Sequence, residues 1–105
     1  MSVRLTFAVV RDVGPAWDDT KQLREQAAWD EHAEFMNALV DDGFVLVGGP
    51  LAGGPKTLLI VSASSEEEIR SRLDADPWTP MGLLVIARIE PWEVLLGAVP
   101  DRTVA

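Results

Sequence analysis

His32 is the one histidine in the sequence, and histidine is the side chain best suited to exchange protons near neutral pH. On a helical wheel it falls on an apolar stripe, so we expect its ring to be partly buried. Such a residue is either a core histidine bonded to a backbone carbonyl or a general acid and base. A metal site is the weaker alternative, because one histidine without cysteines specifies zinc poorly. We therefore expect no metal, and no motif for an organic cofactor is present.

Asp76 is the second candidate for chemistry, and it directly precedes Pro77. Asp-Pro is also common at turns, where the aspartate bonds to nearby backbone, so a structural role alone explains the residue. If Asp76 instead contacts His32, its carboxylate fixes the tautomer of the imidazole and raises its basicity. The two side chains would then form a general acid/base dyad.

Aromatic and cationic residues near these candidates could complete a substrate pocket. Trp29 and Trp78 lie close to the two polar candidates in the sequence, and Phe7 is a third aromatic candidate. Large aromatic residues in small domains are usually core or interface residues, so both interpretations stay open. Arg24 could orient a substrate carboxylate, or it could be a surface charge.

The elements that position His32 come early in the chain. Residues 3–10 alternate between apolar and other side chains, which predicts a strand. Residues 11–21 have no period and read as a loop long enough to serve as a lid. Residues 22–42 carry a helical period with His32 among the apolar positions, and Gly43 follows as a left-handed cap.

The second half of the chain predicts two strands, a helix and a final strand. Ser65 and Glu68 have the spacing of a capping box, which starts the helix. The predicted elements are a hairpin of strands at 44–47 and 57–62, a helix to about residue 74, and a strand at 82–89. The order predicts an α+β, ferredoxin-like βαββαβ fold, in which two helices cover one face of an antiparallel four-stranded sheet.

Several strands carry apolar residues on both faces. Ala8 and Val10 lie opposite Phe7 and Val9, for example. A sheet that is apolar on both faces needs cover on both faces. We therefore expect a homodimer in which two sheets pack through their open faces with two-fold symmetry.

Length, charge and composition narrow the function classes. The 105 residues suit one domain, at 1–96, with a C-terminal tail at 97–105. Seventeen acidic and nine basic residues leave a net charge of -8, so nucleic acid is not an expected partner. No apolar run approaches the roughly 18 residues of a membrane span. The absence of cysteine fits a reducing cytoplasm, which is the expected location.

The sequence resembles the YCII-related domain family over about residues 3–96. The motifs that carry the resemblance are Trp-Asp-Glu-His-Ala-Glu-Phe-Met at 29–36, Gly43, Gly-Gly-Pro-Leu at 48–51, Asp-Pro-Trp at 76–78 and Pro-Trp at 91–92. The resemblance implies a dimeric α+β barrel with His32 placed beside Asp76. Many members carry arginine three residues before the histidine, where this chain has Trp29, so an anionic substrate would need Arg24 or Arg88 instead.

Two functions follow as alternatives. The family includes a dehydrochlorinase-like enzyme and resembles muconolactone isomerases in fold, which implies a lyase or isomerase acting on a small cyclic organic acid. If this chain is such an enzyme, we expect His32 to act as the general base and acid and Asp76 to orient the His32 ring. The alternative is a non-catalytic dimeric module that binds a metabolite through the same residues.

Overall fold

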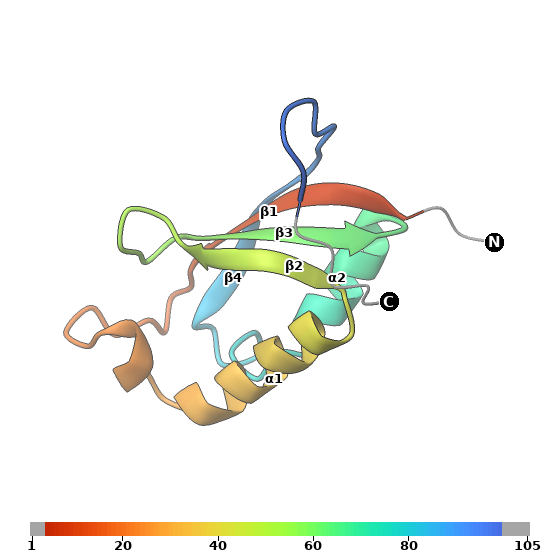
Figure 1. Ribbon diagram of the computed structural model, residues 1–105. Helices are drawn as coiled ribbons and strands as arrows, with labels where there is room; N and C mark the ends of the chain where they lie inside the picture. Colours follow the sequence, from red (N-terminus) through yellow and green to blue (C-terminus); the bar gives the residue numbers. More distant parts are fainter. Residues whose placement is uncertain (1–3, 100–105) are drawn as a thin grey trace.

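The protein is described by a computed structural model that covers residues 4–99 (Figure 1). The elements are β1 (Leu5–Val13), a 3-10 turn η1 (Leu23–Glu25), α1 (Trp29–Asp41), β2 (Val45–Pro50), β3 (Thr57–Ala63), α2 (Glu66–Asp74) and β4 (Leu84–Pro91). The predicted βαββαβ order is therefore confirmed. Residue 3 and the end of the predicted tail, from residue 100 on, lie outside the described residues.

The four strands form one antiparallel sheet in the order β2-β3-β1-β4. Both helices lie on the same side of it (Figure 1). The predicted alternation in β1 is confirmed, because Phe7 and Val9 are buried on the helix side. They join a core built from the sheet and both helices, with buried members Leu39, Phe44, Val45, Leu59, Val61, Ala63, Ile69 and Leu73.

The ends of both helices follow the sequence signals. Gly43 adopts a φ of 85°, the left-handed conformation expected after α1. Ser65 caps α2 by accepting a hydrogen bond from the Glu68 amide at 3.1 Å. The Glu68 carboxylate turns back to the Ser64 amide at 2.7 Å, and this bond helps hold the pKa of Glu68 below its usual value. These caps fix where each helix begins and ends against the sheet.

The prediction of one helix over 22–42 is wrong in its first part. α1 begins at Trp29, and Ala28 before it has a positive φ of 58°. The Gln26 side chain is buried and donates to the carbonyls of Asp18 and Lys21. These bonds hold the chain in a folded-back loop, which a continuous helix cannot form.

The loop predicted at 11–21 is also shorter, because β1 continues to Val13. The remaining segment is tied to the turn before β4 by backbone bonds from Gly14 to Leu83 and from Ala16 to Gly82. Trp17 adds an edge-to-face contact with Trp78, with ring centroids 6.0 Å apart. The segment thus packs against the residues that surround Asp76.

Replacing Gly14 by alanine should lower the free energy of unfolding by about 1–3 kcal/mol. A β-carbon at Gly14 would overlap the carbonyl oxygen of Gly82, so one of the two segments must shift. Gly49→Ala is the matched control, because a β-carbon there meets nothing within 4 Å. Urea unfolding of both variants checks this, and equal stability of the two would contradict the close approach.

Candidate active site

His32 and Asp76 lie in direct contact. Nδ1 of His32, on α1, is 2.8 Å from Oδ2 and 3.0 Å from Oδ1 of Asp76, which follows α2 in the turn toward β4. The Asp76 side chain is fully buried, whereas 10% of the His32 side chain is exposed. The imidazole is therefore the more accessible group of the two.

Asp76 is fixed by two further donors. The backbone amide of Trp78 donates to Oδ1 at 2.9 Å, and Nη2 of Arg11 lies 3.0 Å from Oδ2. Burial alone would raise the pKa of Asp76, but the hydrogen bonds from His32 and Trp78 and the charge of Arg11 outweigh it and lower the pKa. Asp76 is thus a carboxylate at neutral pH.

The charge of Asp76 determines the tautomer of His32. A carboxylate only accepts hydrogen bonds, so Nδ1 of His32 must carry a proton to make its contact. In the neutral ring the other nitrogen, Nε2, is then an unprotonated acceptor. This is the arrangement that a general base requires.

Trp78 holds the plane of the His32 ring. The two rings are stacked, with centroids 3.8 Å apart and planes 4° from parallel. Trp78 is itself fully buried, and its Nε1 donates to the carbonyl of Ala27 at 2.6 Å. Trp29 lies beside both rings, at 5.7 Å from His32 and 5.8 Å from Trp78. The imidazole is therefore positioned by aromatic contacts as well as by Asp76.

The remaining candidates lie at different distances from this group. Arg24 places its guanidinium 5.8 Å from the centre of the Trp29 ring, so it lies near the aromatic cluster. Phe7 belongs to the main core between sheet and helices, in a separate cluster of buried residues from Trp78. Arg88 pairs with Val10 in the sheet register and with the Glu90 carboxylate, on the face away from the helices.

Arg11 is a buried residue of this group that was not predicted. Arg11 lies two residues after Val9 and so falls on the same strand face as Phe7 and Val9. An arginine on an otherwise apolar strand face is the sequence signal that could have identified it. A buried arginine needs a buried acceptor, and Asp76 supplies it. Burial lowers the pKa of Arg11, and the Asp76 carboxylate offsets part of this effect. A guanidinium remains charged at neutral pH.

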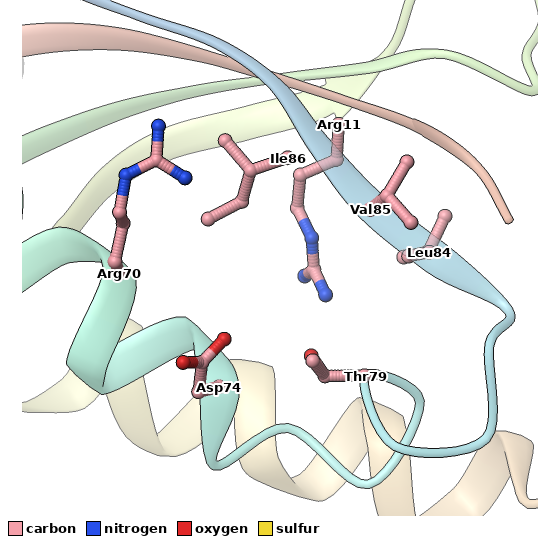
Figure 2. Close-up of a pocket in the computed structure, with 7 residues that line it drawn as sticks. All are labelled: Arg11, Arg70, Asp74, Thr79, Leu84, Val85 and Ile86. Carbon is pink, nitrogen blue, oxygen red and sulfur yellow. The ribbon is translucent and has the colours of Figure 1, made fainter.

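A pocket of about 220 Å³ borders Arg11 between α2 and β4 (Figure 2). Its lining residues are Arg11, Arg70, Asp74, Thr79, Leu84, Val85 and Ile86. His32 and Asp76 do not line it. The pocket therefore borders Arg11, which contacts Asp76, but it does not border the imidazole of His32.

Within residues 4–99, no three histidine, aspartate or glutamate side chains converge as they would around a metal ion. In the same range, no helix is long and apolar enough to cross a membrane.

The acidic pKa of Asp76 predicts a specific pH dependence of stability. A carboxyl group that is more acidic in the folded state stabilises the fold above its unfolded pKa, and this contribution is lost as the pH falls through the folded pKa. The difference in unfolding free energy between wild type and Asp76→Asn should therefore be largest near neutral pH and shrink below about pH 4. Urea unfolding at several pH values measures it, and a difference that stays constant would contradict the lowered pKa.

Comparison with known proteins gives a similarity to a solved structure and none to a family profile or a curated sequence. No protein-family profile matches the chain, and no curated protein sequence matches it significantly. Among solved structures, it is similar to 5-chloro-2-hydroxyhydroquinone dehydrochlorinase from Burkholderia phenoliruptrix AC1100, in complex with 2,5-dihydroxybenzoquinone. The identity is 26%, the TM-score is 0.62, and the match covers 85% of this chain and 94% of that chain. The chain thus shares its α+β fold with a dehydrochlorinase.

Proposed function

We propose that this protein is a small-molecule enzyme of the lyase or isomerase type, in which His32 moves a proton and Asp76 orients it. The observation that carries the proposal is the contact of Nδ1 with a buried carboxylate, since it leaves Nε2 free as a base. The similarity to a dehydrochlorinase supports a lyase-type activity, because eliminating hydrogen chloride removes one proton and one chloride ion. A small cyclic organic acid or a hydroxylated ring is the substrate class that fits this chemistry.

The reaction begins when Nε2 takes a proton from a carbon next to an electron-withdrawing group. The carbon–hydrogen bond breaks, and its electron pair enters the conjugated system of the substrate. In a lyase this pair forms a double bond as the leaving group departs with the electron pair of its bond to carbon, and the imidazolium then releases its proton to water. In an isomerase the imidazolium returns the proton at another carbon. Asp76 stabilises the imidazolium in both cases.

The roles of the surrounding residues follow from their positions. Trp78 keeps the imidazole in one plane, and Trp29 forms an aromatic wall beside it. Arg24 is the candidate for binding the anionic group of a substrate, because its guanidinium lies over the Trp29 ring beside the imidazole. This position substitutes for the arginine that Trp29 replaces in the family pattern.

Two assays test the function. Chloride release from 5-chloro-2-hydroxyhydroquinone tests elimination, and NMR in heavy water detects exchange of carbon-bound protons in a panel of cyclic keto acids and quinones. We expect one substrate to react, with the exchange lost when His32 is replaced. A ligand that binds tightly but exchanges no proton over hours would favour the non-catalytic binding module.

We further propose that the active protein is a homodimer joined through the sheet face opposite the helices. On that face Ala8 pairs with Ile60, and Val10 pairs with Leu58. The same face carries two exposed apolar side chains. Val47 pairs with Ile60, and Val85 pairs with Asp12. A second copy fits this face because a two-fold axis matches each apolar patch to itself.

Replacing Val10 by glutamate should convert the dimer into a monomer, because the charge would be buried against the apolar face of the second copy. Sedimentation equilibrium should give about twice 11.5 kDa for wild type and 11.5 kDa for the variant. Ala38→Glu, at an exposed position of α1, is the matched control and should remain dimeric. A monomeric wild type at micromolar concentration would contradict the proposal.

A further inference from the structure

We propose that Arg11 is a positioning residue of the active site, which holds the Asp76 carboxylate and, through it, the His32 ring. The inference rests on the proposed function, and it adds a third member to the pair. Arg11, Asp76 and His32 come from β1, from the turn after α2 and from α1, so the three meet only in the folded protein.

The contacts of Asp76 show how Arg11 acts. Oδ2 is shared between Nη2 of Arg11, at 3.0 Å, and Nδ1 of His32, at 2.8 Å. Oδ1 is held by the Trp78 amide. With one oxygen bound by a backbone amide and the other by a guanidinium, the carboxylate cannot rotate away from the imidazole.

The other donors of Arg11 are poorly used. Among the described residues, Nε has no hydrogen-bond partner, and the contact of Nη1 is with the Met36 sulfur at 3.7 Å. A buried donor without an acceptor costs about 1–3 kcal/mol. An arginine that served only packing would be better replaced by an apolar residue. These contacts therefore indicate that the function of Arg11 is its ion pair with Asp76.

The strand next to Arg11 is irregular on the β4 side. The pairing of β1 with β4 passes from Val10 and Arg88 to Arg11 and Ile86, so it skips one residue of β4, as at a β-bulge in β4, whereas the pairing of β1 with β3 is continuous through Arg11. Bulges change the direction of a side chain and are frequent beside active sites. β1 is also bonded on both sides, to β3 and β4, which makes it a rigid support.

Arg11 changes the charge that the imidazole faces. The charged groups against Asp76 are His32 from α1 and Arg11 from β1, and Arg70 and Asp74 of α2 border the pocket beside Arg11. Arg11 and Asp76 together form a neutral pair, so a proton taken by His32 is held less firmly than beside a lone carboxylate. This balance suits a group that must accept a proton and then release it.

Neutral variants at position 11 test the inference. In Arg11→Met and Arg11→Gln, the doubly protonated His32 ring should persist to higher pH in ¹⁵N NMR spectra, because the Asp76 carboxylate without its guanidinium favours the imidazolium. The acidic limb of the pH–rate profile should move in the same direction, and kcat should fall about tenfold with little change in KM. Arg11→Lys keeps the positive charge, so the acidic limb of its pH–rate profile should lie where it does in the wild type. Arg70→Met, an exposed arginine at the same pocket, should leave all three readouts unchanged.

A purely structural Arg11 would give a different result. The neutral variants would then unfold more easily while the His32 spectrum and the pH limb stayed as in wild type, and this outcome would overturn the inference. If Arg11→Met does not fold, Arg11→Gln decides, because its amide can still donate to Asp76. The ring spectrum needs no substrate, so an inactive wild type would refute the proposed function while leaving the test of Arg11 intact.

Discussion

Replacing His32 by alanine should lower kcat on a reactive substrate by a factor on the order of 10²–10⁴. The variant keeps Asp76 paired with Arg11 and with the Trp78 amide, so the turn after α2 retains its main contacts. It loses the only imidazole of the chain, and therefore the group that exchanges protons near neutral pH. Steady-state kinetics together with the far-UV circular dichroism spectrum separate lost chemistry from lost structure.

Two further variants sharpen this result. His32→Gln can still donate a hydrogen bond to Asp76 but cannot transfer a proton, so it should be as inactive as the alanine variant. Glu34→Gln changes an exposed residue two positions along α1 and should be fully active. Turnover by His32→Gln at the wild-type rate would show that His32 only binds the ligand.

Replacing Asp76 by alanine should lower the free energy of unfolding by about 3–5 kcal/mol. Arg11 would then remain buried without a counter-charge, because it is 2% exposed and its ion pair is with Asp76. The Trp78 amide and Nδ1 of His32 would lose an acceptor at the same time. Urea or thermal unfolding measures the loss, and Asp74→Ala, an exposed residue two positions earlier, should change stability little.

The double variant Arg11→Met with Asp76→Ala identifies the source of that loss. Removing both charges leaves no unpaired ion, so the double variant should be more stable than Asp76→Ala alone. Losses that simply add would mean that the two residues do not interact, contrary to their 3.0 Å contact.

Much of the fold could be predicted from the sequence, because local periodicity coincides with burial. The alternation in β1 and the caps at Gly43 and Ser65 all appear in the structure. The start of α1 could not be predicted, since it depends on contacts distant in sequence. Gln26 bonds to the Asp18 backbone, and Trp78 bonds to Ala27 from 51 residues away.

The candidate site could be predicted only in part, because contacts between residues distant in sequence decide which side chains meet. His32 and Asp76 were identified by residue type, and their contact depends on how α1 packs against the turn after α2. Arg11 falls in the predicted loop over residues 11–21, a segment that has no sustained period in the sequence. Its partner lies 65 positions further along the chain, so no local pattern shows that the charge is compensated.

The most direct test of the central claim is the tautomer of His32 in the resting protein. A ¹H–¹⁵N spectrum of the ring at neutral pH should show one proton, on Nδ1, and an unprotonated Nε2. Asp76→Asn should disturb this state, because an amide cannot accept from Arg11, Trp78 and His32 together. A ring that carries its proton on Nε2, or one that is unchanged in Asp76→Asn, would contradict a base oriented by Asp76.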